Sequence, residues 1–455
     1  MTKYKGNSLR RNRAFPSHRI FRKEESDMSE LLKLSSAIID GQKTVSHHGQ
    51  MNRINFQLSE IDNDLAIVEA FSHCIVLNTD DGLVAFDTSG PAGGPKVVKA
   101  IREWEKKPFN ALIYTHGHID HVGGCGAFIE DAKQANSQKP RVIGHENISK
   151  RFGRYRETNN FNMIINERQF GQFSRRGYDI LDKKSFLPAT SPEPNETYQE
   201  RMNLKIGDTE INLTHARGET DDHTWAWIPD KKLICAGDFF IWCFPNAGNP
   251  QKVQRFPSEW ARAMRAMAEQ GAELFMPAHG LPIEGKDRIK RVLLEVAQAL
   301  EFLVSETLSR MNEGATLDET IHEVKLNQAT LEIPYLRPVY DEPEFVVRNI
   351  WRMYGGWYDG NPANLKPAPA ADLANELASL SGGAKNLASR ALELAQHQIR
   401  LACHLIEFAV MAEPENKIVH EIRAEIYQTR RDQESSLMSK GIFGSAANES
   451  KEKVT

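Results

Sequence analysis

Three histidines and an aspartate lie within six residues of this sequence, in the segment THGHIDHVGG. Imidazole nitrogens are good ligands for zinc, and a carboxylate can hold a second divalent ion. His116 and His118 alternate along an extended segment, so both can reach one ion, whereas the adjacent Asp120 and His121 can turn toward another. A solvated histidine-rich loop would explain a single pair of histidines. Four potential ligands directly after the apolar segment FNALIYT instead favour a metal centre.

The segments around this cluster predict the elements that must position it. LAIVEAF and HCIVLNTDDGLVAFDT predict short strands around an Asp-Asp-Gly turn, and GGPKVVKAIREWEKK predicts a helix. FNALIYTH predicts a buried strand that ends at the histidines. Strand patterns recur in INLTHA, WAWIP, KLICAGDFF and ELFMPAHG. This alternation indicates an α/β or α+β sandwich with its chemistry at strand ends.

Helical patterns dominate after about residue 285. KDRIKRVLLEVAQALEFLVSETLSRM predicts a long amphipathic helix, and residues 332–369 form a connector rich in Pro, Gly and aromatics. Three or four further helices follow, which favour a packing or dimerisation domain over a binding groove. We therefore expect a largely disordered arm (1–45), a sandwich domain (46–290), a helical domain (291–440) and a disordered tail (441–455).

Composition excludes several classes of partner and location. The net charge of −4 gives no electrostatic reason to expect a nucleic acid, and no apolar run approaches the length of a membrane span. Five scattered cysteines without a CxxC pair favour a reducing compartment. The basic first 23 residues lack the apolar core of a secretory signal, which favours a disordered arm over a targeting arm. We therefore expect a cytoplasmic protein with no signal peptide and no integral membrane segment.

The histidine cluster resembles the metallo-β-lactamase superfamily, because its THxHxDHxGG motif is matched at every fixed position. The resemblance implies an α+β fold in which an αββα sandwich forms the catalytic domain. It also implies further ligands at strand ends. Asp238 in CAGD matches the bridging aspartate of the family, and His279 in MPAHG matches its last histidine.

The remaining ligand departs from the usual pattern. Most members have Gly-His-Thr nineteen residues before the bridging position, where this chain has Glu219 (238 − 219 = 19). His223, fifteen residues before Asp238, is an alternative that the spacing favours less. The resemblance thus implies two divalent ions, most simply Zn²⁺, roughly 3.5–4 Å apart. The first is held by His116, His118 and Glu219, the second by Asp120, His121 and His279, and Asp238 bridges them.

A glutamate at position 219 resembles the alkylsulfatase branch of the superfamily. The segment NIWRMYGGWYDGNPANLKP, residues 349–367, is similar to the signature of the alkylsulfatase dimerisation domain. Together the resemblances cover roughly residues 50–445. They imply a homodimeric hydrolase that cleaves alkyl sulfate esters with a metal-activated hydroxide, its sandwich followed by an all-α dimerisation domain.

Two departures from the residues typical of that branch leave a second hydrolase activity as an alternative. The branch usually has Glu where this chain has Asp238, and it tends to have Tyr where this chain has Phe170 in NERQFG. The alternative is a hydrolase of another ester, a thioester, lactone or phosphodiester. A catalytically silent scaffold is less favoured, because every ligand position is filled.

Candidate substrate contacts lie between the metal motifs. Arg168 in NERQFG and Arg255 in NPQKVQR are candidates to bind an anionic head group. Together with Asp120 and His223 they form the candidate catalytic set, and Asn246 and Asn249 are weaker candidates. The tryptophans could line an apolar channel, but a core or interface role is favoured for each: Trp242, Trp260, Trp351 and Trp357.

Overall fold

Two β-sheets stacked face to face form the centre of the protein. The computed structural model describes residues 29–44, 53–175 and 185–455. The first sheet has seven strands in sequence order: β1 (Leu58–Asp62), β2 (Leu65–Val68), β3 (Cys74–Thr79), β4 (Gly82–Phe86), β5 (Phe109–Ile113), β6 (Arg141–His145) and β7 (Glu196–Tyr198). The second has six strands in the order β13-β12-β11-β10-β9-β8: β8 (Arg201–Ile206), β9 (Thr209–His215), β10 (Thr224–Ile228), β11 (Leu233–Gly237), β12 (Leu274–Pro277) and β13 (Ile283–Glu284).

The first sheet changes from antiparallel to parallel pairing at β4, whereas the second sheet is antiparallel except for one parallel pair. Strands β1 to β4 form an antiparallel meander, and β4 to β7 pair in parallel. Strands β8 to β11 are antiparallel, whereas β11 and β12 are parallel. Alternate residues of β3 face opposite sides, as strand geometry requires. Ile75 and Leu77 join the core between the sheets, while Cys74 and Val76 join a second core outside them.

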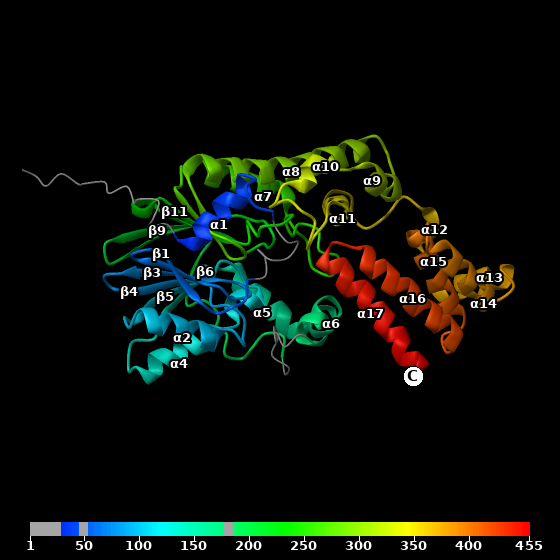
Figure 1. The fold of residues 1–455 in the computed structure, drawn as a ribbon, viewed down its shortest axis with the longest axis horizontal. Coiled ribbons are helices and arrows are strands. Elements are labelled where there is room, and N and C mark those ends of the chain that lie inside the picture. The colour runs from blue at the N-terminus through cyan, green and yellow to red at the C-terminus, as the bar shows by residue number, and fades with distance from the viewer. Residues whose placement is uncertain (1–28, 45–52, 176–184) are drawn as a thin grey trace, which may run out of the picture.

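Helices cover both outer faces, which makes the predicted αββα sandwich (Figure 1). The outer face of the first sheet shares a core with apolar side chains of α2 (Gly94–Trp104), α4 (Cys125–Gln134) and α5 (Asn147–Glu157). The second sheet is covered by α7 (Pro257–Glu269) and α8 (Lys286–Asn312). The predicted fold class is therefore confirmed for the sandwich.

A helical region follows and extends to one side of the sandwich, as Figure 1 shows. It has its own core of small and aliphatic side chains, in which Ala388, Ala402 and Ile406 are fully buried. Its helices are α9 (Leu317–Glu323), α10 (Gln328–Glu332), α11 (Pro343–Gly355), α12 (Pro362–Leu365), α13 (Ala370–Leu380), α14 (Ala384–Leu394), α15 (Ile399–Ala412), α16 (Lys417–Gln433) and α17 (Leu437–Val454).

The predicted disorder of the tail, residues 441–455, is wrong. This segment is most of α17, whose first turn is capped by the Ser436 hydroxyl. The helix is held by tertiary packing against α16 and against α6 (Asn159–Arg175). Gly441 allows the close approach to α6, since a Cβ at this position would overlap the carbonyl oxygen of Gln169.

The predicted arm is also more ordered than expected. Residues 1–28, where the basic cluster lies, are outside the described residues. Residues 30–39 form α1, which buries Leu31, Leu32 and Ile38 and begins at the capping Ser29. The predicted boundary at residue 290 falls inside α8, whose apolar side chains belong to the core of the sandwich. Within the described part of the chain, no helix is both long and apolar enough to cross a membrane.

Candidate metal centre

The predicted ligands meet at one edge of the sandwich because they follow strands that run in the same direction. The histidine loop follows β5, and its second half forms the short helix α3 (Ile119–Val122). Asp238 follows β11 and His279 follows β12, a parallel pair in the second sheet. Glu219 comes from the connection between β9 and β10. The carboxyl ends of parallel strands share one edge, so residues far apart in sequence meet there.

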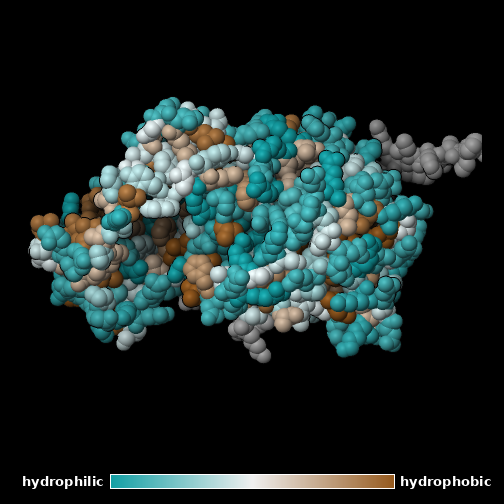
Figure 2. Space-filling model, turned by 180° about the vertical axis from the view of Figure 1, so that it is seen from behind, coloured by the Kyte–Doolittle hydropathy of each residue, from teal (hydrophilic) through white to brown (hydrophobic). Residues whose placement is uncertain are grey.

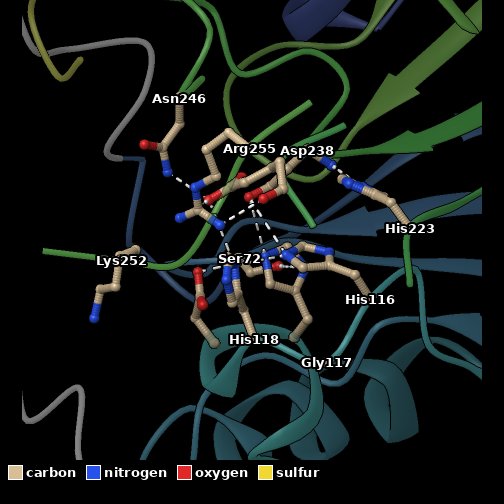
Figure 3. A network of polar contacts seen from close by, with 12 residues as sticks. Ser72, His116, Gly117, His118, His223, Asp238, Asn246, Lys252 and Arg255 are labelled. Atoms are coloured by element: carbon tan, nitrogen blue, oxygen red, sulfur yellow. Dashed lines mark hydrogen bonds and ion pairs between the residues drawn. The ribbon is translucent and has the colours of Figure 1, made fainter. Parts of the chain in front are cut away.

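Four of the seven side chains form a first cluster, and their potential ligand atoms all lie within 4.8 Å of one another. Nε2 of His116 lies 2.9 Å from Nδ1 of His118. Nδ1 of His118 is 3.5 Å from Oε1 of Glu219, and Nε2 of His116 is 3.9 Å from Oδ2 of Asp238. This cluster contains the first predicted ligand set together with the predicted bridging aspartate. Figure 3 shows His116, His118 and Asp238 of this cluster.

Asp120, His121 and His279 form a second cluster. Nε2 of His121 and Nε2 of His279 each lie 3.4 Å from Oδ2 of Asp120. Asp238 lies between the two clusters, with Oδ2 at 3.4 Å from His121 Nε2 and Oδ1 at 3.4 Å from His279 Nε2. The structure therefore brings all seven predicted ligands together, with the carboxylate of Asp238 within 4 Å of histidines of both clusters.

The donor atoms of this site fit a pair of divalent ions. Nε2 of His121, Oδ1 of Asp238 and Oε2 of Glu219 are buried and have no hydrogen-bond partner among the described residues. Buried polar atoms are nearly always satisfied, and each exception needs an explanation. Imidazole nitrogens and carboxylate oxygens converging on one point are the donor set that zinc and related ions accept.

The histidines and carboxylates of the two clusters shift one another's pKa values. Burial opposes the protonated forms of His121 and His279, but Asp238 and Asp120 outweigh it and raise both pKa values, that of His279 to about 10. Burial also favours protonation of Asp238, yet these two histidines hold its pKa well below the usual range. Burial raises the pKa of Glu219 to about 8. Ligation requires neutral histidines, so metal binding here must release protons.

Asp87, which was not among the predicted site residues, orients His121. It follows β4 with a positive φ of 60° and accepts hydrogen bonds from the backbone N–H and the hydroxyl of Thr115, both at 2.8 Å. Its Oδ2 lies 2.7 Å from Nδ1 of His121, and the Ser72 hydroxyl lies 3.0 Å from the same nitrogen. These contacts leave Nε2 of His121 to face the second cluster. The only signal in the sequence is an aspartate at the end of the strand in VAFDT.

Arg255 and Asn246 hold the unusual ligand Glu219 in place. Arg255 is 1% exposed, and its Nη1 and Nη2 donate to the carbonyl oxygen and to Oε1 of Glu219, the latter at 3.4 Å. The amide of Asn246 also donates to Oε1. The guanidinium that sequence suggested for the substrate is thus already paired with a ligand, and its contact with substrate stays a prediction.

Two predicted residues lie outside the ligand clusters and the cavity wall: His223, the alternative metal ligand, and Arg168, a candidate head-group contact. Nε2 of His223 accepts the backbone N–H of Asp238 at 3.1 Å, and the ring is stacked between His116 and Phe239. His223 therefore contacts Asp238 and His116 without joining either ligand cluster, which disfavours His223 as the alternative metal ligand. Arg168 is exposed on α6, donates to Gln251 and does not line the cavity.

A cavity of about 470 Å³ opens over the clusters, and His118, Asp120, Glu219, Asp238 and His279 form part of its lining. Much of the remaining wall is apolar and comes from distant segments: Phe71, Ile119, Phe161, Ile165, Phe170, Phe186, Ile241, Val253 and Leu437. Tyr340 lies in the same wall, parallel to Phe170 with ring centroids 6.3 Å apart. None of the tryptophans lines the cavity; Trp242, Trp260 and Trp351 are buried and Trp357 is 69% exposed.

Comparison with known proteins matches two parts of the chain to described families. Residues 68–279 match the metallo-beta-lactamase superfamily, and residues 316–453 match the alkyl sulfatase dimerisation family. A linear primary-alkylsulfatase of Pseudomonas sp. is 25% identical over 378 residues, which cover 78% of this chain and 69% of that protein. An (R)-specific secondary-alkylsulfatase of Pseudomonas sp. is 24% identical over 437 residues, which cover 89% and 64%.

The fold also matches a solved structure. The stereoselective inverting sec-alkylsulfatase Pisa1 from Pseudomonas sp. superposes with a TM-score of 0.73 at 23% identity, over 88% of this chain and 66% of that one. This likeness covers the sandwich and the helical region together. The chain spans about two thirds of the length of these relatives.

Proposed function

The chain belongs to the metallo-beta-lactamase superfamily and carries an alkyl sulfatase dimerisation region, and from this premise we propose that it hydrolyses alkyl sulfate esters. One observation carries the proposal. Seven side chains suited to two divalent ions cluster together, and five of them line a cavity that also has many apolar side chains in its wall. An alkyl sulfate has the same two parts, an anionic head that reacts and an apolar tail that does not. The relatives named alkylsulfatases support the choice of this ester.

The two ions would be held as the ligand clusters suggest, and the nitrogen-rich donor set favours zinc. His116, His118 and Glu219 would hold one ion, Asp120, His121 and His279 the other, and Asp238 both. When bound, such a pair supplies hydroxide near neutral pH and Lewis acidity toward an ester oxygen. Arg255 and Asn246 keep Glu219 in place, and Asp87 keeps His121 in the orientation that ligation needs.

The apolar wall would bind and orient the alkyl tail. Burial of one CH₂ group is worth about 0.8 kcal/mol. Each added methylene should therefore lower KM about fourfold, until the tail outgrows the wall. Holding the tail also fixes the head group over the ligand clusters, which converts binding energy into orientation at the reacting atom.

A substrate panel on the metal-loaded protein tests the function. We expect turnover of primary or secondary alkyl sulfates, with little activity on thioesters or lactones of the same chain length. If sulfate esters stay intact while another ester turns over, the alkylsulfatase assignment is wrong. The departures at Asp238 and Phe170 make that other ester hydrolase the alternative.

We further propose a homodimer formed through the helical region. Apolar side chains are exposed along α12 to α16, among them Leu365 at 54%, Leu373 at 50% and Leu380 at 77%. Figure 2 shows hydrophobic surface gathered at the helical end of the molecule. Light scattering after size exclusion should give twice the chain mass for the wild type and the monomer mass for Leu380→Glu. A monomeric wild type would contradict the proposal.

A cytoplasmic location is also proposed. The five cysteines all lie in the described part of the chain and form no disulfide there, and four of them are buried, which suits a reducing compartment. Fractionation of cells that express the chain tests this location, and recovery in a secreted fraction would contradict it.

A further inference from the structure

Lys252 lies in the cavity wall on the segment that connects Asn249 to Arg255. Its ammonium group donates to Oδ1 of Asn166 at 3.0 Å. No carboxylate of the described residues forms an ion pair with it. Figure 3 shows Lys252 on the same side of the site as Asn246 and Arg255, without a contact to the other residues drawn. A partly buried cation that lacks an anionic partner suits an anionic ligand.

The position of Lys252 is fixed by α6. The buried amide of Asn166 donates through Nδ2 to the carbonyl oxygen of Asn162 at 2.7 Å, which leaves Oδ1 to accept from Lys252. The neighbouring Gln251 donates to the carbonyl oxygen of Ile165 at 3.0 Å. Lys252 and Gln251 therefore both bond to α6, and these contacts hold the lysine side chain in the cavity wall.

The other cations of the cavity have other partners. Arg255 is paired with Glu219. The side chain of Arg151 is almost fully buried and pairs with Asp222 at 2.7 Å and with Asp221. Arg352 is exposed and donates to Gln254. Arg154 lies over the ring of Tyr155, with its guanidinium carbon 5.8 Å from the ring centroid.

The charges of nearby residues shift the pKa of Lys252. Burial and the nearby Arg255 lower its pKa to about 7, while the carboxylates of Asp120 and Glu219 act in the opposite direction. An anion placed between the lysine and the metal ligands would therefore be attracted from both sides once the ions are bound.

We propose that Lys252, oriented by Asn166, is the side chain that binds the anionic head group of the substrate and so selects sulfate esters over neutral esters. This inference rests on the proposed function. An ammonium group acts as a point charge with rotatable donors, so it can follow the head group without the bidentate geometry that an arginine would impose. The phenol of Tyr340 and the apolar wall would then meet the remainder of the substrate.

Binding of a non-hydrolysable head group tests the assignment. Octanesulfonate is titrated by calorimetry into zinc-loaded wild type, Lys252→Met, Lys252→Arg and the control Lys99→Met, a change at an exposed lysine of α2, and octanol serves as the neutral probe. Loss of a charged hydrogen bond predicts roughly tenfold to hundredfold weaker octanesulfonate binding by Lys252→Met. Lys252→Arg and Lys99→Met should bind it within a few-fold of wild type, and octanol should bind all four proteins alike.

The outcomes separate this inference from the function on which it rests. If the wild type cleaves octyl sulfate but Lys252→Met binds octanesulfonate as tightly as the wild type does, Lys252 is not the head-group contact and the function stands. A loss of octanol binding in Lys252→Met would overturn the assignment as well, because it would show a structural role. A zinc-loaded wild type that neither cleaves octyl sulfate nor binds octanesulfonate would overturn the function and the inference together.

Discussion

Replacing Asp87 by asparagine should weaken the second metal site without touching a ligand. A histidine that ligates through Nε2 carries its proton on Nδ1 and donates it to a neighbouring acceptor. In this protein the acceptor is Oδ2 of Asp87, 2.7 Å from Nδ1 of His121, while Oδ1 accepts the backbone N–H of Thr115. An asparagine has only one oxygen, so in either orientation its NH₂ group meets one of these donors.

The size of the effect follows from these contacts. Loss of such an orienting partner typically costs 10- to 100-fold in metal affinity, or about 1.4–2.7 kcal/mol. The Ser72 hydroxyl, 3.0 Å from the same nitrogen, can accept the proton in part. We therefore expect roughly tenfold weaker binding in Asp87→Asn, and a loss near 100-fold when Ser72→Ala is added.

Competition with a chromophoric chelator measures this directly. Metal-free protein is titrated with Zn²⁺ and two dissociation constants are fitted, with circular dichroism to check that each variant is folded. The matched control is Asp80→Asn, an exposed aspartate in the turn between β3 and β4. One of the two dissociation constants should rise in Asp87→Asn while the other stays at its wild-type value, because Asp87 contacts a ligand of one cluster only. Wild-type constants for both steps in Asp87→Asn would show that this carboxylate does not orient His121 for ligation.

Three further outcomes follow from individual contacts. Glu219→Ala should retain one zinc equivalent after dialysis in place of two, because His223 already accepts the Asp238 backbone N–H and cannot replace the lost ligand; two equivalents by elemental analysis would contradict this. Lys252 is cationic only below its lowered pKa of about 7, so kcat/KM for octyl sulfate should fall as the pH rises through that value, and Lys252→Arg should abolish this fall because arginine stays charged. Gly441→Ala should lower the free energy of unfolding by about 1–3 kcal/mol through overlap with α6, whereas Gly153→Ala, with open space around it, should not; equal denaturation midpoints would refute the packing argument.

The ligand clusters could be predicted from sequence because each ligand sits next to a short local signal. His116 to His121 follow one buried strand, and Asp238 and His279 each follow another. Strand direction then decides where these ends meet, and a parallel pair places them at one edge. Glu219 was found by its spacing to Asp238, which holds because both residues flank the same antiparallel β10–β11 hairpin.

The choice among Lys252, Arg168 and Arg255 could not be made from sequence in the same way. All three lie on segments between the metal motifs, and the sequence suggested the two arginines. The outcome depends on partners. Arg255 is paired with Glu219, Arg168 lies on the exposed face of α6, and of the three cations Lys252 is the one that lines the cavity without an ion pair to the described residues. Such partners come from tertiary packing, which a local pattern does not encode.

The packing of α17 explains why the sequence predicts disorder for a tail that is helical in the structure. Leu437 begins α17 and lines the cavity, and Gly441 one turn later brings that helix against α6, which carries Ile165 and Phe170 of the same wall. The segment SAANES gives a weak amphipathic signal because the buried positions of α17 there are small residues, Ala447 and Ser450, and not large apolar ones. The substrate wall is thus assembled by the helical region as well as by the sandwich. A change confined to the packing of α17 on α6 should therefore raise KM for long-chain sulfates while leaving the two zinc equivalents in place.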